Sequence, residues 1–484
     1  MTKLDVPPVE RQALRLPDVP QWLQVAGSRI VDATGRTVRL TGFGLGGLLN
    51  LENFITGYPG NEEAIRRHLR RAMGREAYEA FFEAYEQAFF DRPDAEFIAS
   101  LGMNSVRVPV NYRQFEDDAS PFTLKEEGFH KLDRVIDLLR EAGLYTIIDL
   151  HAAPGYQNHH WHSDNPTHQA LFWQHPHFQD RVVNLWEALA ERYKDRPEVA
   201  GYNPLNEPAD ETNTVVPAFY RRLERAIRAV DDRHILFLDG NRYSTDFSCF
   251  DEPFANAVYA AHDYAGPGVA GATEYPGTFR GEYFDKDALE RSFLRRTEFM
   301  RRTGTPIWVG EFGPMYPPEK PHEEFRFQVL EDQLDIYDAY GASWALWTYK
   351  DVGLQGAVYT DPASEYLRLI EGVRDLKSRL GTDSWGGSDL GVRDILDPID
   401  AIMDREFPDY APYPWGRRQH VFGLVRHILL AEPLAEEFGK LFAGVTPERA
   451  RELAESFSFA KSLQRGRLVD ILRPRGTTQS APQN

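Results

Sequence analysis

The sequence predicts an α/β protein built on a (β/α)8 TIM barrel, with a helical insertion after the first strand and a helical extension at the C-terminus. Eight short apolar runs follow one another along the chain, and most are separated by segments with helical periodicity. No G-x-G-x-x-G loop follows the first run in a compact βαβ unit, which disfavours a doubly wound open sheet. We therefore expect a closed barrel.

The eight apolar runs have the length and composition of buried parallel strands. The expected strands are Leu40–Gly44, Ser105–Val110, Tyr145–Leu150, Val199–Pro204, Ile235–Leu238, Val258–His262, Ile307–Gly310 and Ser343–Trp347. The expected helices between and after them are Asp94–Leu101, Glu127–Ala142, His177–Lys194, Val216–Val230, Asp287–Thr303, Phe325–Tyr340 and Ser364–Leu380.

The remaining segments lie outside this repeating pattern. Alternating residues from Trp22 to Leu40 predict a β-hairpin with its turn at Ala33–Arg36, and residues 61–92 are strongly helical. The tail is mostly helical after Val392, with a break at Pro408–Pro414. We expect an N-terminal arm over residues 1–21, a barrel over 22–380, and a helical extension over 381–484 that packs on the barrel.

Composition excludes several classes of partner. The net charge of −19 disfavours nucleic acid and anionic membrane surfaces, because phosphate binding needs clustered Lys and Arg. The single cysteine, Cys249, rules out an internal disulfide framework and a cysteine-based zinc site. No run approaches the ~18 apolar residues of a membrane span, and the first residues lack the apolar stretch of a signal peptide. We therefore expect a cytoplasmic protein with a small neutral ligand.

Two glutamates stand where a predicted strand meets a loop. Glu207 lies in Asn206-Glu207-Pro208 after the fourth strand, and Glu311 lies in Gly310-Glu311-Phe312-Gly313 at the end of the seventh. Active sites of (β/α)8 barrels lie at the carboxyl ends of the strands. The two carboxylates are therefore expected on one rim.

Further polar and aromatic side chains end the other strands. They are Glu52 after strand 1, Arg107 on strand 2, His151 after strand 3, Asn206 after strand 4, His262 and Tyr264 after strand 6, and Trp347 after strand 8. Retaining glycoside hydrolysis needs a protonated acid and an ionised nucleophile about 5–5.5 Å apart. An Arg and a Tyr hydroxyl beside the nucleophile keep it ionised, and a Trp face can stack on a sugar ring. This set fits that chemistry.

The set Arg107, His151, Asn206-Glu207-Pro208, His262-x-Tyr264, Glu311 and Trp347 resembles glycoside hydrolase family 5 over roughly residues 22–375. That family consists of (β/α)8 retaining β-glycosidases with their glutamates on strands 4 and 7. The resemblance implies roles for eight positions. Glu207 would be the acid/base and Glu311 the nucleophile. Arg107 and Tyr264 would contact the nucleophile, and His262 would support the two glutamates. His151 and Asn206 would hold sugar hydroxyls, and Trp347 would form the floor of subsite −1.

Two stretches resemble the exo-β-1,3-glucanase branch of the family. They are Gly44–Thr56, which contains Glu52, and Asp149–Asn158. This similarity implies that Glu52 holds a terminal sugar, and it places Asn158 among the substrate-binding candidates. Leu48, Gly313 and Tyr349 depart from that branch, so no β-1,3 specificity is inferred.

The insertion 159–175 is rich in His and Trp, and His160-x-His162 has a spacing that can chelate a metal. The hydrolysis needs no metal and no His-Glu-x-x-His motif is present, so we expect no metal and no cofactor. We expect instead an aromatic loop, with Trp161, that shapes the aglycone side.

The sequence thus predicts a retaining β-glycosidase that removes terminal β-glucosyl-type residues. An endo-acting β-glucanase and a glycosidase that cleaves glycolipids or diglycosides remain open as alternatives. A non-catalytic carbohydrate-binding barrel is the alternative from another class. Both glutamates are present in the chain, whereas such a barrel would be free to lose either.

Overall fold

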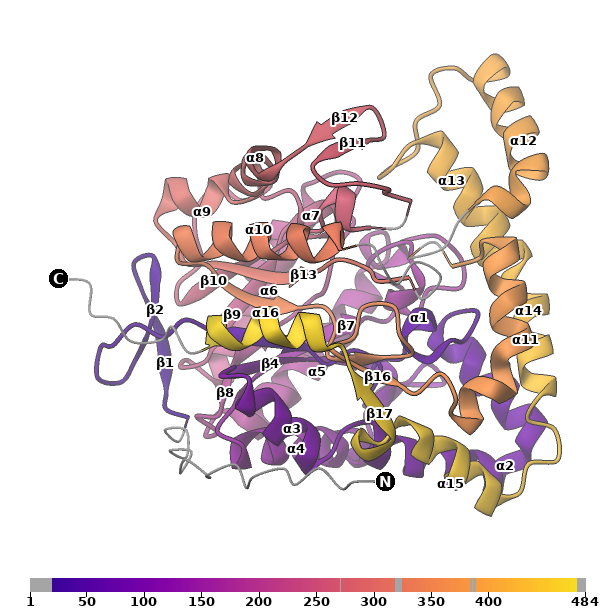
Figure 1. Ribbon diagram of the computed structural model, residues 1–484. Helices are drawn as coiled ribbons and strands as arrows, with labels where there is room; N and C mark the ends of the chain where they lie inside the picture. The colour runs from indigo at the N-terminus through magenta and orange to yellow at the C-terminus, as the bar shows by residue number, and fades with distance from the viewer. Residues whose placement is uncertain (1–19, 270, 318–323, 384, 386–388, 477–484) are drawn as a thin grey trace, which may run out of the picture.

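The computed structural model describes residues 20–476 apart from 270, 318–323, 384 and 386–388, and it confirms the predicted barrel (Figure 1). Eight parallel strands close on themselves, and their order around the barrel is their order in the chain. The barrel strands are β3 (Thr41–Gly44), β4 (Ser105–Asn111), β7 (Tyr145–Ala152), β8 (Val199–Asn203), β9 (Ile235–Asp239), β10 (Ala257–His262), β13 (Ile307–Phe312) and β14 (Ser343–Leu346). The expected N-terminal arm lies almost entirely outside the described residues.

Helices connect these strands and cover the outside of the barrel. They are α3 (Arg92–Ser100), α4 (Glu126–Glu141), α5 (Pro176–Tyr193), α6 (Val215–Val230), α7 (Asn241–Ser244), α8 (Lys286–Arg296), α9 (Glu298–Thr303), α10 (Phe325–Ala339) and α11 (Glu365–Leu380). The predicted helix Asp287–Thr303 is divided between α8 and α9. The break is at Thr297, whose hydroxyl donates to the carbonyl of Phe293, a bond that competes with regular helix geometry.

The N-terminal hairpin closes the bottom of the barrel. Strands β1 (Leu23–Ala26) and β2 (Arg29–Asp32) pair through a two-residue turn at Gly27-Ser28, which was not predicted. The expected turn at Ala33–Arg36 follows β2, where the N–H of Gly35 donates to the carbonyl of Asp32 and Val31 pairs antiparallel with Thr37. Gly27 has φ +59°, which suits the tight hairpin turn. Leu23 and Ile30 pack into the buried cluster of the barrel interior with Tyr145, Ile235 and Trp308.

The insertion after β3 and most helices of the C-terminal extension form a side layer (right in Figure 1), whereas the end of the chain returns to the barrel. The insertion comprises α1 (Asn53–Thr56) and the long α2 (Glu62–Phe89), which has a non-helical residue at Gly74. The extension comprises α12 (Arg393–Glu406), α13 (Arg417–Gly423), the π-helical turn η6 (Leu424–Leu429), α14 (Ala431–Lys440), α15 (Pro447–Ala454), β17 (Ser462–Gln464) and α16 (Gly466–Gly476). Helices α14 and α15 pack on α2, and α16 packs beside α10.

Short strands complete the structure. Strand β17 pairs antiparallel with β16 (Val358–Thr360), which pairs with β15 (Lys350–Asp351), so the end of the chain returns to the barrel. Two further hairpins lie in the loops, β5–β6 (Glu116–Asp117, Ser120–Leu124) and β11–β12 (Gly277–Phe279, Glu282–Phe284). Among the residues that the structure describes, no helix is long and apolar enough to cross a bilayer.

Lys350 contacts the barrel helix α3, the insertion and the C-terminal extension with one side chain. Its side chain is fully buried, forms an ion pair of 2.5 Å with Asp94 of α3, and donates to the carbonyls of Phe89 and Phe457. A buried ion pair is maintained only when hydrogen bonds satisfy the ammonium group. The barrel, the insertion and the extension thus meet at one charged group.

Candidate active site

The two glutamates lie together at the carboxyl ends of the strands, as predicted. Both line a cavity of about 640 Å³, and one carboxylate oxygen of Glu207 lies within 4.8 Å of one of Glu311. His262, at the end of β10, lies within the same distance of both. This separation belongs to the short class of about 5–5.5 Å, in which one carboxylate attacks the sugar directly, and not to the class of about 6.5–9.5 Å, which leaves room for a water.

Glu207 is held in a strained backbone conformation just past β8. Its φ is +46°, and its N–H donates to Asp239 Oδ2 at 2.9 Å. His262 Nδ1 lies 2.7 Å from Oε1, and His162 Nε2 lies 3.0 Å from Oε2. Burial raises the pKa of Glu207, Glu311 raises it further, and the contact with His262 only partly offsets this. Glu207 is therefore suited to carry a proton.

Glu311 has the opposite surroundings. Arg107 Nη1 donates to Oε1 at 2.5 Å, and the hydroxyl of Tyr264 donates to Oε2 at 2.8 Å. Burial by itself would raise its pKa, but the charges of His262, Arg107 and His151 together lower the pKa of Glu311 to about 2. Glu311 is therefore ionised at any physiological pH.

Two carboxyl groups whose pKa values are driven apart in one cavity can divide the work of acid and nucleophile. In the part of the chain that the structure describes, only Glu207, His262 and Glu311 bring three potential metal-ligating atoms within 4.8 Å of one another. The histidines of the 159–168 loop do not form such a group. The site is complete for acid–base and nucleophilic chemistry with protein side chains alone.

Trp347 and His151 form a flat wall beside the pair. Their rings stack at 5.4 Å with an interplanar angle of 2°, and both line the cavity. A Cβ on Gly44 or Gly46 would lie 2.4 Å or 2.7 Å from the indole of Trp347, so the glycines of this strand end are needed to seat it. This explains the glycine-rich start of the Gly44–Thr56 stretch.

Glu52 lies on the same side of the cavity. It precedes α1 but its side chain does not cap that helix, and its buried Oε1 has no hydrogen-bond partner. Oε1 lies 3.5 Å from Nε2 of His151. Although burial opposes the charge on His151, Asp149 at 2.7 Å and Glu52 raise its pKa to about 10. A charged imidazolium and a carboxylate therefore form an ion pair on the cavity wall.

The other expected site residues fall into two groups. Trp161 lines the cavity, whereas Arg107 and Asn206 are fully buried behind its wall. Arg107 Nη2 donates to Asn206 Oδ1 at 2.7 Å, so Asn206 helps to orient the guanidinium that touches Glu311.

Asn158, a substrate-binding candidate from the sequence, lies behind the cavity wall. It is fully buried and lies outside the cavity lining. Its Oδ1 accepts from the N–H of His160, and its Nδ2 lies 3.1 Å from the carbonyl of Glu207 and 2.8 Å from His162 Nε2. Asn158 thus supports the loop that carries Glu207.

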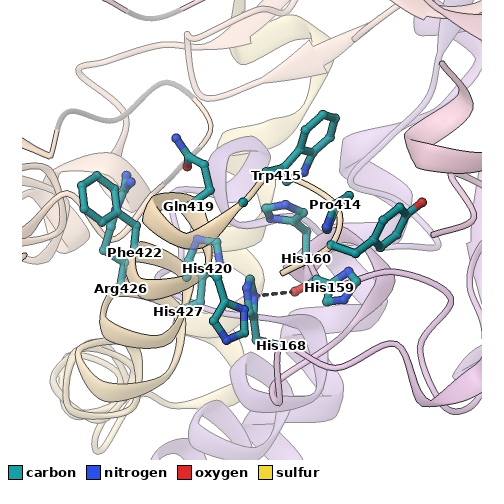
Figure 2. Close-up of a pocket in the computed structure, with 13 residues that line it drawn as sticks. His159, His160, His168, Pro414, Trp415, Gln419, His420, Phe422, Arg426 and His427 are labelled. Atoms are coloured by element: carbon teal, nitrogen blue, oxygen red, sulfur yellow. Dashed lines mark hydrogen bonds between the residues drawn. The ribbon is translucent and has the colours of Figure 1, made fainter. Parts of the chain in front are cut away.

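The C-terminal extension forms one side of the cavity. Its contributing residues are Asp383, Trp385, Trp415, Gln419 and His427. His427 packs at 4.4 Å between ring centroids on Trp161 and at 5.7 Å on His160. Figure 2 shows His159, His160 and His168 of the loop facing Trp415, His420 and His427 of the extension.

Sequence reasoning missed several residues of the site. His162 was recognisable only as part of a His-rich stretch, and Asp239 only as the end of a strand. Trp385 and Trp415 gave no signal, because nothing in a helical tail indicates which of its side chains reach the barrel rim.

The family comparison matches this geometry. Residues 77–353 match the family model described as cellulase (glycosyl hydrolase family 5). The chain belongs to glycosyl hydrolase family 5. As a member of the family it is a retaining β-glycosidase, and the comparisons give no support to a non-catalytic binding barrel.

Named relatives of the enzyme differ in activity. It is 44% identical to a "Beta-xylosidase" of Phanerodontia chrysosporium, over 93% of this chain and 97% of the relative. It is 29% identical to a "Probable glucan 1,3-beta-glucosidase A" of Aspergillus clavatus, over 70% and 88%. It is 26% identical to "Endoglucanase C" of Acetivibrio thermocellus, over 57% and 89%.

Among solved structures, the fold is similar to that of an endogalactoceramidase. The TM-score is 0.51 at 20% identity, over 68% of this chain and 75% of that one. This likeness concerns the fold alone.

Proposed function

We propose that the enzyme is an exo-acting retaining β-glycosidase that removes one terminal β-xylosyl or β-glucosyl residue at a time. Glu311 is the nucleophile and Glu207 the acid/base. The observation that carries the exo assignment is Glu52, a buried carboxylate on the cavity wall whose Oε1 accepts no hydrogen bond and lies 3.5 Å from charged His151. A buried oxygen that accepts no hydrogen bond from the protein favours a ligand hydroxyl that supplies one.

The division of roles follows from the contacts of the two carboxylates. Glu311, ionised by Arg107 and Tyr264, attacks the anomeric carbon, while Glu207 gives its proton to the leaving oxygen. Glu207 then removes a proton from water, which attacks the glycosyl-enzyme and frees Glu311. His262 contacts Glu207 at 2.7 Å and lies 3.6 Å from Glu311, so it stabilises charge on whichever carboxylate is ionised.

The enclosure of the site supports action at a chain end. A volume of about 640 Å³ lies within the ~300–1,000 Å³ of small-ligand sites. Loop residues of the barrel and residues of the extension both contribute to its wall, including Glu52, Trp161 and Trp415. A carboxylate and an imidazolium on that wall can bind several hydroxyls of a terminal sugar, as charge-assisted hydrogen bonds require.

The choice between a pentose and a hexose rests on the relatives. The 44% identical relative bears the name β-xylosidase, and the resemblance of Gly44–Thr56 is to enzymes that act on glucosyl residues. Rates on 4-nitrophenyl β-xyloside and β-glucoside decide between the two sugars. An oligosaccharide labelled at its reducing end distinguishes exo from endo action. Release of mixed oligomers, instead of single sugars from the non-reducing end, would overturn the exo assignment.

Trapping tests the roles of the glutamates. A 2-deoxy-2-fluoro glycoside of the preferred sugar is expected to label Glu311, as peptide mass spectrometry would show, and a label elsewhere contradicts the assignment. Glu52→Gln is expected to lower kcat/KM about 10- to 100-fold, because a hydrogen bond to a charged group is worth about 1.5–3 kcal/mol. Glu432→Gln, a change at an exposed carboxylate of the extension, is the matched control and should leave kcat/KM unchanged.

A further inference from the structure

Each carboxylate oxygen of Glu207 faces an imidazole. His262 Nδ1, from the end of β10, lies 2.7 Å from Oε1. His162 Nε2, from the short 3-10 helix Trp161–Ser163 in the loop after β7, lies 3.0 Å from Oε2. The ring of His162 is held in place by stacking on His160, which in turn packs on His427 of the extension (Figure 2 shows His160 and His427). The protonation of His162 therefore decides what Oε2 can do.

Asn158 identifies the proton-free nitrogen of His162. Its Oδ1 accepts the N–H of His160 at 3.0 Å, and its Nδ2 lies 3.1 Å from the carbonyl oxygen of Glu207. Exchanging the two amide atoms would oppose two oxygens at one contact and two N–H groups at the other, so the orientation is fixed. Nδ2 also lies 2.8 Å from Nε2 of His162. An amide nitrogen only donates, so Nε2 accepts and the ring proton of His162 is on Nδ1.

A bare Nε2 cannot donate to Glu207. An ionised Oε2 at 3.0 Å would face the lone pair of Nε2 with no proton between them, whereas a protonated Oε2 can share that lone pair with the N–H of Asn158 in a three-centre hydrogen bond. On the other side, Nδ1 of His262 lies 2.7 Å from Oε1, and an Nδ1–H there can donate to the carbonyl oxygen of the protonated acid. The contacts on both sides are satisfied together when the proton of Glu207 is on Oε2.

We propose that His162 is a positioning residue that holds the acid proton on Oε2 of Glu207 and disfavours the carboxylate form. The proposal rests on Glu207 being the acid/base. When a glycosidic oxygen enters the cavity, the proton turns from Nε2 to that oxygen, the C1–O bond breaks, and a bond forms between C1 and Glu311. Asn158 keeps its hydrogen bond to Nε2, so His162 accepts no proton itself. The carboxylate left behind faces the lone pair of Nε2, which strengthens it as the base toward water.

The electrostatic surroundings support a neutral His162. Burial, and then the charge of His151, lower the pKa of His162 to about 4. The other titratable groups around Glu207 include His262 on β10, Glu311 on β13, Asp239 on β9, His151 on β7, Tyr243 on α7 and Tyr264 after β10. The His262 ring contacts Oε1, and the His162 ring contacts Oε2.

His162→Phe tests the proposal with two substrates that carry the same sugar. Dinitrophenolate leaves without a proton, whereas phenolate needs the acid, so only the phenyl glycoside reports on Glu207. We expect His162→Phe to lower kcat/KM on the phenyl glycoside about tenfold or more. On the dinitrophenyl glycoside kcat/KM should stay within about twofold of the wild type. The alkaline limb of the pH profile of kcat/KM on the phenyl glycoside should move about one pH unit lower. His162→Gln, whose amide oxygen can accept from Oε2, should recover part of the loss.

The controls separate this proposal from the one on which it rests. His420→Phe, at a histidine of the extension outside the cavity lining, should behave as wild type. Glu207→Ala should show an even larger difference between the two substrates; if it shows none, the acid/base assignment is wrong. If Glu207→Ala shows the difference and His162→Phe lowers both substrates equally with an unmoved alkaline limb, only the role of His162 is overturned.

A measurement on the intact protein is independent of folding of the variants. In ¹⁵N-histidine-labelled enzyme, the His162 resonances, assigned by their loss in His162→Gln, should report a neutral ring with the proton on Nδ1 at pH 6. A proton on Nε2 of His162 at that pH overturns the proposal.

Discussion

Tyr264→Phe removes one of the two hydrogen bonds that keep Glu311 ionised. The hydroxyl donates to Oε2 at 2.8 Å, and a hydrogen bond to a charged group is worth about 1.5–3 kcal/mol. Because the bond stabilises the ionised form, its loss raises the pKa of Glu311. At 1.36 kcal/mol per unit the increase is about one to two units, from about 2 in the wild type to about 3–4 in the variant.

The acid limb of kcat/KM on an aryl β-glycoside measures this change. The wild type should remain near its plateau at pH 3, whereas the variant should fall about two- to tenfold below its own plateau, because a nucleophile with a pKa of 3–4 is half or more protonated there. Tyr275→Phe, which removes a buried hydrogen bond of 2.7 Å to Asp332 away from the cavity, is the matched control. An acid limb that stays in place in Tyr264→Phe while the plateau falls would refute the electrostatic role of Tyr264.

Three further predictions concern the scaffold and the cavity. Lys350→Met leaves the charge of Asp94 buried without its partner and should cost about 3–5 kcal/mol of unfolding free energy in urea titrations; if adding Asp94→Asn recovers none of it, the ion pair is not the cause. Burial raises the pKa of Asp239 to about 7 despite Arg107, so its contribution to stability is present below about pH 4 and is lost as pH rises through 7. Asp239→Asn should therefore flatten the fall in unfolding free energy across that range, and an unchanged slope contradicts the raised pKa. Trp415→Ala removes an aromatic wall of the cavity and should raise KM about five- to tenfold with kcat retained; a fall in kcat at constant KM would show that the wall acts on catalysis instead.

Much of the barrel was predictable because its strands are buried on both faces. Such strands are continuous apolar runs whose ends are marked by the first polar residues, and those residues include the functional ones at the rim. Strand boundaries were correct to within a few residues, as Ser343–Leu346 illustrates. The N-terminal segment was predicted with one turn at Ala33–Arg36, and the structure has that turn and a second one at Gly27-Ser28, which joins β1 to β2.

The sequence by itself determined the barrel, the family and the two carboxylates, because periodicity and strand-end residues are local properties of the chain. The tertiary structure decided how those carboxylates differ. The low pKa of Glu311 comes from Arg107 and His262, and the protonated state of Glu207 from burial and, as proposed, from His162, all brought in by other strands and loops. The tertiary structure also brings Trp385 and Trp415 from the C-terminal extension to the barrel rim, where they line the cavity. Electrostatic shifts and cavity walls depend on distances of a few ångströms between residues far apart in the chain, and only packing sets those distances.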